Sequence, residues 1–204
     1  MKKSPLSSQV TPLSPRRPSR SEAEDAVRTL IAWSGDNPAR PGLEKTPARV
    51  SDAFGEYFSG YGADPIAELE AGTFDDPSAY DDMVLLKGIN FESHCEHHIA
   101  PFFGVAHVAY RPKDRVVGLS KIARVVDIFA RRLQTQERLS GEIAAALMEG
   151  LDAKGVAIMM TARHHCMAAR GAQQPHVETV TFRFLGDFEH DSELRARFTA
   201  AVRE

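Results

Sequence analysis

The sequence predicts an α+β domain in which N-terminal helices precede an antiparallel sheet covered by a pair of helices. A length of 204 residues is enough for one domain with its own core. Segments with strand character occur in two groups, and a long stretch of helical periodicity separates them. Strands, then helices, then strands again favour this arrangement over repeated βαβ units.

Residues 1–20 are expected to form a disordered tail. They contain four Pro, five Ser and five Lys or Arg, with no acidic residue. Such a segment buries too little apolar surface to offset the entropy lost on ordering. The folded domain is therefore expected over 21–204, with a helical part at 21–82 and a catalytic α+β part at 83–204.

Two helices are expected in the N-terminal part. The first begins at Ser21, which would form a capping box with Glu24. The second opens at Thr46, which would cap a helix that has Pro47 in its first position. The acidic stretch that follows, 60–82, contains Gly and Pro and is interpreted mainly as loop.

The catalytic part shows alternation typical of strands on both sides of two helical segments. The expected strands are Met83–Phe91, Gly104–Arg111, Arg115–Leu119, Gly155–Arg163 and Val177–Phe184. The first helix of the pair presents Ile122, Val125, Val126 and Phe129, and the second, from about Thr135, presents Leu139, Ile143, Leu147 and Leu151. Asp191–Arg203 is expected to be a terminal helix.

Composition excludes several classes of protein. The net charge of −3 offers no general attraction to nucleic acid or to anionic lipid. No apolar run reaches the ~18 residues of a membrane helix, and polar residues follow Met1 where a signal peptide would be apolar. The only two cysteines, Cys95 and Cys166, are too few for a secreted disulfide scaffold. These features indicate a cytoplasmic protein.

The two cysteines lie in unusually polar surroundings. Cys95 is part of a run from Ser93 to His98 that holds three histidines and a carboxylate, and Cys166 directly follows His164 and His165. Zinc prefers Cys sulfur and His nitrogen, and a catalytic zinc site keeps one position open. Cys95, Cys166 and one histidine would make such a site. Buried free cysteines near surface histidines, or a closed four-ligand structural site, remain alternatives, whereas zinc-finger and nucleoside-deaminase spacings are missing.

Basic residues gather at the start of the first helix of the pair. Ser120 can cap that helix, while Lys121 and Arg124 share one of its faces. A helix N-terminus with two cations suits a polyphosphate, although a solvated basic face is the more common explanation. Glu137, at the start of the second helix, either complements the helix dipole or accepts hydrogen bonds from a guanine edge. Arg170 follows Cys166 by four residues and would bring a cation near the metal.

Several motifs in register resemble one family. They are Gly42-Leu43-x-x-Thr46-Pro47-x-Arg49-Val50, Cys95-Glu96-His97-His98 with Pro101-Phe102-Phe103-Gly104, Gly118-Leu119-Ser120-Lys121-x-x-Arg124, Arg131-Arg132-Leu133-Gln134-x-Gln136-Glu137-Arg138-Leu139 and His164-x-Cys166-Met167-x-x-Arg170-Gly171. From about residue 22 to the C-terminus, the sequence closely resembles zinc-dependent GTP cyclohydrolase I.

The resemblance implies a role for each matching residue. It makes Cys95, His98 and Cys166 the zinc ligands and makes His97 and His164 the acid–base histidines. Ser120 would lie against the ribose, among the catalytic residues. Glu137 would read the guanine with backbone near Gln136, and the triphosphate would be held by Lys121, Arg124, Arg170 and Arg49. His165 and His94 depart from the family pattern and add imidazoles beside the site.

The resemblance also implies the reaction and the assembly. The enzyme would use Zn²⁺ and water to open the imidazole ring of GTP, release formate and form 7,8-dihydroneopterin triphosphate for tetrahydrofolate and pterin synthesis. It would have the tunnelling fold and form a toroidal homodecamer, in which sheets join into a barrel and active sites are shared between subunits. No nucleic acid or membrane partner is expected. The rival hypothesis is a zinc-stabilised assembly that binds nucleotides without turning them over.

Overall fold

The computed structural model describes residues 16–75 and 80–203, which divide into two compact units between Phe58 and Ser59. Residues 1–15, which hold most of the expected tail, lie outside the described part. In the first unit, α1 spans Arg20–Trp33 and α2 spans Thr46–Tyr57. An ion pair of 2.6 Å between Arg20 and Asp52 links these two helices.

Both helices of the first unit begin differently from the sequence prediction. The capping box of α1 joins Ser19 and Glu22, two residues before the expected pair. The Ser19 side chain accepts a hydrogen bond from the Glu22 backbone N–H, and the Glu22 carboxylate accepts one from the Ser19 backbone N–H. In α2, Lys45 occupies the N-cap position, so that Thr46 is helical and does not cap. Pro47 still lies in the first turn, where its missing N–H costs no helical hydrogen bond.

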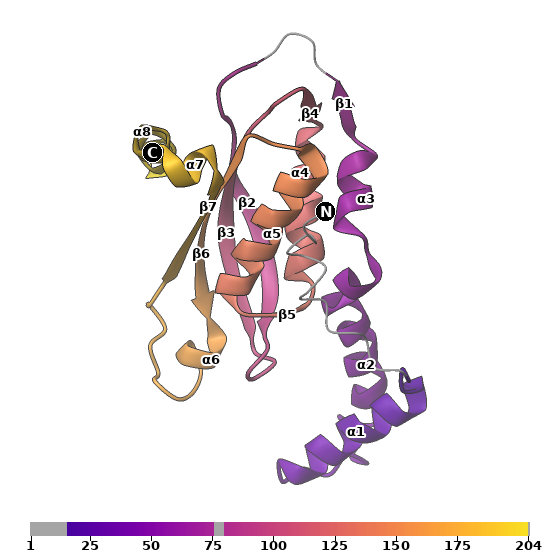
Figure 1. The fold of residues 1–204 in the computed structure, drawn as a ribbon. Coiled ribbons are helices and arrows are strands. Elements are labelled where there is room, and N and C mark those ends of the chain that lie inside the picture. Colours follow the sequence, from indigo (N-terminus) through magenta and orange to yellow (C-terminus); the bar gives the residue numbers. More distant parts are fainter. Residues whose placement is uncertain (1–15, 76–79, 204) are drawn as a thin grey trace. The chain divides into compact units, whose positions relative to one another are not determined.

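The second unit is built on a five-stranded sheet with the strand order β5-β2-β3-β6-β7 (Figure 1). The strands are β2 (Val84–Cys95), β3 (Pro101–Arg111), β5 (Leu133–Gln134), β6 (Gly155–His164) and β7 (Thr179–Gly186). Every neighbouring pair is antiparallel except β2 with β5, a short parallel contact. The predicted antiparallel α+β fold is therefore confirmed.

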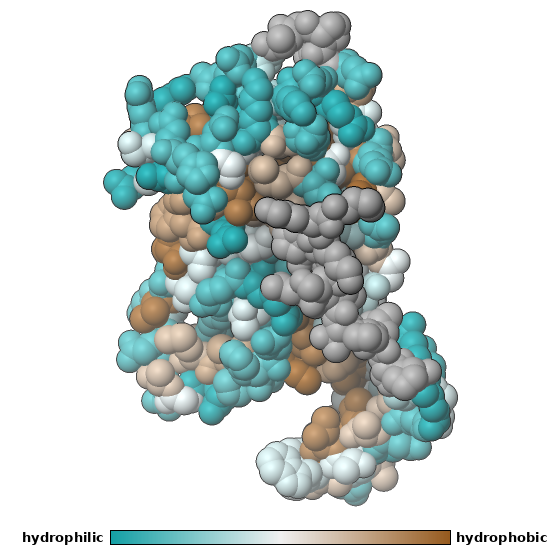
Figure 2. Space-filling model, viewed as in Figure 1, coloured by the Kyte–Doolittle hydropathy of each residue, from teal (hydrophilic) through white to brown (hydrophobic). Residues whose placement is uncertain are grey.

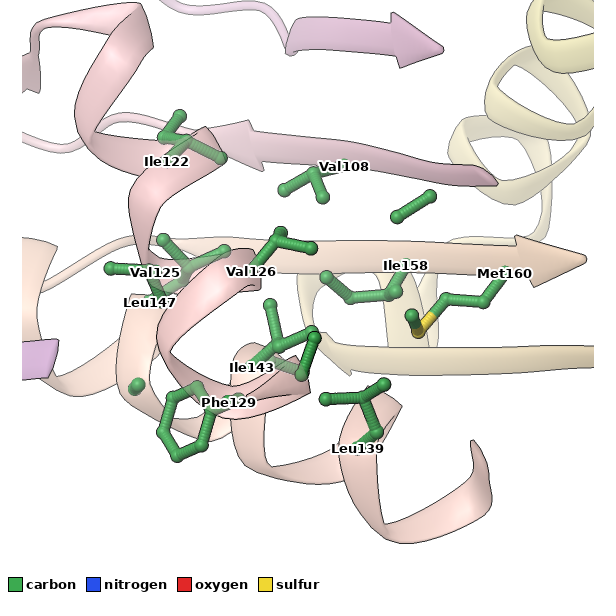
Figure 3. Close-up of a cluster of buried hydrophobic side chains, with 14 of the residues drawn as sticks. Val108, Ile122, Val125, Val126, Phe129, Leu139, Ile143, Leu147, Ile158 and Met160 are labelled. Atoms are coloured by element: carbon green, nitrogen blue, oxygen red, sulfur yellow. The ribbon is translucent and has the colours of Figure 1, made fainter. Parts of the chain in front are cut away.

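Helices cover the two faces of this sheet. On one face, α4 (Leu119–Ala130) and α5 (Gln136–Leu151) bury a continuous apolar core, part of which is shown in Figure 3. On the other, α7 (Asp187–His190) and the terminal helix α8 (Ser192–Arg203) form a smaller core. Alternation along the strands assigns residues to the two cores: Val108 and Ile158 face the large core, whereas Ala109 and Ala157 face the small one.

The stretch interpreted as loop contains more structure than predicted. It holds a 3-10 turn (Ser59–Gly62), α3 (Pro65–Glu70) and β1 (Thr73–Asp75), which pairs with β4 (Arg115–Val117). Asp64 caps α3 by accepting the backbone N–H groups of Ile66 and Ala67. The Asp-Pro pair at 64–65 was the local signal for this helix, and the surrounding acidic, Gly-containing composition obscured it. Residues 76–79 of this stretch lie outside the described part.

Within residues 16–75 and 80–203, none of the helices combines the length and the apolar character that crossing a bilayer requires.

The large core generates a stability prediction. Leu147 of α5 is fully buried in it, so Leu147→Ala should destabilise the fold by about 2–5 kcal/mol through lost burial and a residual cavity. Leu147→Met nearly conserves volume and should cost less than about 1.5 kcal/mol. Thermal and urea unfolding of both variants would measure the difference. Equal losses would show that this part of the core does not depend on close packing.

Candidate metal centre and surrounding site

The sheet brings the two cysteines of the chain together. Cys95 ends β2, and Cys166 follows the end of β6 in the short helix α6 (His165–Ala168). The start of β3 lies between them, since His94 pairs with Pro101 and Phe102 pairs with His164. His98 completes the group, and the ligand atoms of Cys95, His98 and Cys166 all lie within 4.8 Å of one another.

A tight turn between β2 and β3 places His98. The backbone N–H of Ile99 donates to Cys95 O at 2.8 Å, and that of Cys95 donates to Ala100 O at 2.9 Å. Ile99 has a φ of 53°, a conformation that is unusual for a β-branched residue. Strain of this kind is maintained only where surrounding contacts determine the conformation, and it is concentrated at functional sites.

A second set of contacts ties this turn to the start of α5. The backbone N–H of Glu96 donates to Gln134 O at 3.0 Å, and the Glu96 carboxylate pairs with Arg138 at 2.8 Å. Arg138 also donates to Gln134 Oε1 at 3.0 Å. These contacts fix the turn that carries His98 to the first turn of α5.

The three donors fit a zinc ion. Zn–S bonds of ~2.3 Å at tetrahedral angles place two sulfurs ~3.8 Å apart, so the group needs only a small contraction to bind zinc. Burial raises the pKa of the Cys166 thiol, with Cys95 adding to the rise and Arg170 opposing it. A bound cation would favour the thiolate form of both cysteines.

His97 lies beside the three donors. Its Nδ1 is 3.7 Å from Cys95 Sγ, and its ring is 6.2 Å from that of His98, nearly perpendicular to it. Its side chain is exposed, so solvent or a substrate can reach it.

His164 lies at the end of β6 and is held from two sides. Its ring stacks on Phe102 with centroids 4.5 Å apart and an interplanar angle of 8°. Its Nε2 lies 2.8 Å from Oε1 of Gln136. Burial lowers the pKa of His164, and the carboxylate of Glu137 opposes this shift. Glu137 itself is exposed in the first turn of α5 and directly follows Gln136, whose side chain contacts His164.

The two additional histidines do not join the three-donor group. His165 is exposed, and its ring meets Phe103 edge-on at 5.3 Å. His94 is buried within β2, and this burial lowers its pKa.

Two of the residues expected at a polyphosphate, Lys121 and Arg124, lie on a different part of the unit. Lys121 and Arg124 share one face of α4, as predicted, and both donate to Glu68 Oε1, at 2.9 and 3.2 Å. The predicted cap is wrong, because Gly118 takes the N-cap position and Ser120 lies inside the helix with an exposed side chain.

This basic face and the metal group lie at opposite ends of α4. The helix follows β4 and leads to β5, whose Leu133 and Gln134 pair with His94 and Cys95 (Figure 1). From Lys121 to the last residue of α4 the axis rises about 14 Å. Within one chain, therefore, these cations are not brought to the metal group. Arg49 belongs to the first unit, where it is exposed on α2.

Three contributions were missed at the level of sequence. Phe102 and the Gln136 side chain hold His164, and Glu68 pairs with the two cations. Phe102 and Gln136 both belong to the family motifs, but the sequence does not show what they contact. The contact of Phe102 follows from strand register, and that of Gln136 from a buried hydrogen-bond network. Glu68 lies in the stretch interpreted as loop, where no local pattern indicates its partners.

Comparisons with known proteins agree with this geometry. The sequence model of the family described as GTP cyclohydrolase I matches residues 23–203. The chain is 56% identical to GTP cyclohydrolase 1 of Maricaulis maris over 182 residues, covering 89% of this chain and 88% of that protein. It is also 56% identical to GTP cyclohydrolase 1 of Hyphomonas neptunium, covering 92% and 90%.

Among solved structures, the archaeosine synthase QueF-Like in its apo form is only distantly similar. The TM-score is 0.43 at 18% identity, covering 52% of this chain and 94% of the other. The sequence comparisons extend over nearly the whole chain, including all three cysteine and histidine donors. On that basis the chain belongs to the GTP cyclohydrolase I family.

Proposed function

We propose that this chain hydrolyses the imidazole ring of GTP, releases formate and forms 7,8-dihydroneopterin triphosphate, the first step of tetrahydrofolate and pterin synthesis. The observation that carries the proposal is the cluster at one end of the sheet. There a three-donor group, two further histidines and a carboxylate lie together in a chain of the GTP cyclohydrolase I family.

Zinc is the proposed metal, with Cys95, His98 and Cys166 as its ligands. Two thiolates and an imidazole match its preference for sulfur and nitrogen, and three protein ligands leave a fourth position open. When bound, zinc would lower the pKa of a coordinated water towards ~7 and so supply a nucleophile at neutral pH.

His97 and His164 are proposed to move protons during ring opening. His97 lies 3.7 Å from Cys95 Sγ, His164 precedes Cys166 by two residues, and neither is needed to complete the three-donor group. Protonation of purine nitrogen 7 weakens the bond to carbon 8 once water has added there. Imidazole is suited to this task because its pKa lies near the working pH.

Glu137 is proposed to recognise guanine. Its exposed carboxylate, close to His164, can accept hydrogen bonds from the ring N–H and the amino group of the guanine edge, an arrangement that adenine does not offer. The backbone at Gln136 would assist, while Arg170, near Cys166, would contribute positive charge.

Lys121, Arg124 and Arg49 are proposed to hold the triphosphate of a GTP bound at a neighbouring subunit, with Ser120 at its ribose. The separation of Lys121 from the metal group of its own chain supports a shared site. The sheet edge supports assembly, because Val180 and Phe182 on β7 are each 46% exposed and hydrophobic patches interrupt the surface in Figure 2. Edges of this kind are commonly paired with another chain. A toroidal homodecamer in the cytoplasm is the assembly we propose.

A zinc-stabilised assembly that binds nucleotides without catalysis is the rival. The position of His97 beside Cys95, with His164 two residues before Cys166, favours an enzyme, since a purely structural site has no use for proton carriers there.

The catalytic proposal predicts pterin formation. Purified zinc-loaded protein with GTP should develop a pterin absorbance and, after oxidation, pterin fluorescence. Glu137→Ala should raise KM or abolish turnover, because each lost hydrogen-bond partner in a dry pocket costs about 1–3 kcal/mol. GTP binding without any pterin product would favour the rival hypothesis.

The ligand assignment predicts a contrast between adjacent histidines. His98→Ala should lose zinc together with activity, whereas His97→Ala should keep zinc and lose turnover. Cys95→Ser and Cys166→Ser should both lose zinc. Metal analysis of the purified variants would measure this, and full zinc in His98→Ala with loss in His97→Ala would reverse the two roles.

The shared site predicts complementation between inactive variants. Cys166→Ser lacks a metal ligand, and Lys121→Ala lacks a proposed phosphate contact from the neighbour. When the two are co-assembled in equal amounts, about a quarter of the sites should combine an intact metal group with an intact lysine. Activity should recover to that level. A mixture of Cys166→Ser with Cys95→Ser is the matched control and should stay inactive.

Recovery in the control mixture, or no recovery with Lys121→Ala, would contradict a site shared in this way. Sizing of the wild-type protein adds a separate criterion. An active species of only 22.5 kDa would exclude the shared site.

A further inference from the structure

The side chain of Gln136 is buried and makes its hydrogen bonds within the protein rather than to a ligand. Gln136 is the first residue of α5, and only 1% of its surface is exposed. Its amide contacts β6, β7 and His164. We propose that Gln136 is a positioning residue that holds His164 in the tautomer with hydrogen on Nε2, so that Nδ1 is the nitrogen that exchanges protons with the substrate.

The orientation of the Gln136 amide follows from its partners. Its Nε2 lies 3.0 Å from Met160 O, 3.0 Å from Thr179 O and 3.3 Å from Thr181 Oγ1. Backbone carbonyl oxygens only accept hydrogen bonds, so the atom facing two of them must be the NH₂ group. The reversed amide would set its own oxygen against both carbonyl oxygens and lose the two hydrogen bonds to them.

The tautomer of His164 follows in turn. With the NH₂ group of Gln136 committed to β6 and β7, its Oε1 is the atom that lies 2.8 Å from His164 Nε2. An amide oxygen has no hydrogen to donate, so His164 Nε2 must carry one. In the neutral ring the hydrogen is then absent from Nδ1.

The ring is also prevented from turning over. Phe102 is fully buried and stacks on the imidazole with nearly parallel planes, from the position directly opposite His164 across β3 and β6. A half turn of the ring would bring a ring carbon, in place of Nε2, next to the Gln136 oxygen, and the hydrogen bond between them would be lost. The stack and the hydrogen bond together leave one orientation and one tautomer.

This arrangement assigns a direction to proton transfer. In the proposed reaction, Nδ1 takes the proton released by the water that adds to carbon 8 and passes it to purine nitrogen 7, so the sum is the addition of one water across the bond between carbon 8 and nitrogen 7. The other ring hydrogen stays on Nε2 throughout and is donated to Gln136 Oε1. The assignment rests on the proposed acid–base role of His164, but the tautomer itself does not depend on the reaction.

The first test is spectroscopic and needs no activity. In zinc-loaded wild-type protein labelled with ¹⁵N-histidine, solid-state NMR distinguishes protonated from bare ring nitrogens. A His164→Gln sample identifies the His164 signals by their disappearance. A protonated Nε2 and a bare Nδ1 support the proposal, and hydrogen on Nδ1 overturns it even if the protein has no activity on GTP.

The second test separates positioning from substrate binding. Gln136→Met has a similar shape and removes the acceptor for His164, so kcat with GTP should fall at least about tenfold while KM and zinc content stay near wild type. Thr181→Val removes only the 3.3 Å contact of the amide and should reduce kcat much less.

The pattern of these constants decides between the roles. A rise in KM with unchanged kcat in Gln136→Met would mean that the residue reads guanine, and this overturns the proposal. An unchanged kcat with full zinc would overturn it as well. Because Gln136→Met also removes buried hydrogen bonds to β6 and β7, its melting temperature is compared with that of Thr181→Val, and the wild-type NMR result remains decisive in either case.

Discussion

The pairing of β3 with both β2 and β6 controls where the reactive groups of this chain lie. Because β2 and β6 both run antiparallel to β3, their C-terminal ends meet at the same end of the sheet, on either side of Pro101 and Phe102. Cys95 and Cys166, seventy-one positions apart in the printed sequence, become neighbours through this register. A shift of one residue in either pairing would turn one ligand to the opposite face of the sheet.

The same register explains why the histidines differ although they are close in sequence. His98 is carried back over Cys95 by the strained turn at Ile99, so it can share a metal with that sulfur. His164 remains in the strand, opposite Phe102, where burial lowers its pKa. His165, one residue later, already lies in a short helix and is exposed. Position relative to the strand end, rather than residue type, separates these environments.

Sequence patterns were sufficient for the elements with strong periodicity. The α4–α5 pair follows from apolar residues at helical spacing, and β3 and β6 follow from alternation. Sequence patterns did not predict where a helix begins when one or two capping contacts determine its start, as Ser19 does for α1 and Asp64 does for α3. The donors Cys95, His98 and Cys166 were anticipated through the family resemblance, whereas the contacts of Gln136 were not. Gln136 lies in α5 and its amide takes its partners from β6 and β7, and only tertiary structure defines such a combination.

Glu68 shows how a carboxylate can shape an anion site before the anion arrives. It holds Lys121 and Arg124 at hydrogen-bond distance, and the Lys121 bond is the main cause that lowers the pKa of Glu68. The carboxylate is therefore ionised at neutral pH and competes with any phosphate for these two cations. A triphosphate carries several charges and more acceptor oxygens, so it can displace one carboxylate, but at the cost of separating an existing ion pair. A single phosphate group has fewer charges and fewer acceptor oxygens with which to displace the Glu68 carboxylate. If this face holds the triphosphate as proposed, Glu68 would bias it towards ligands with more than one phosphate.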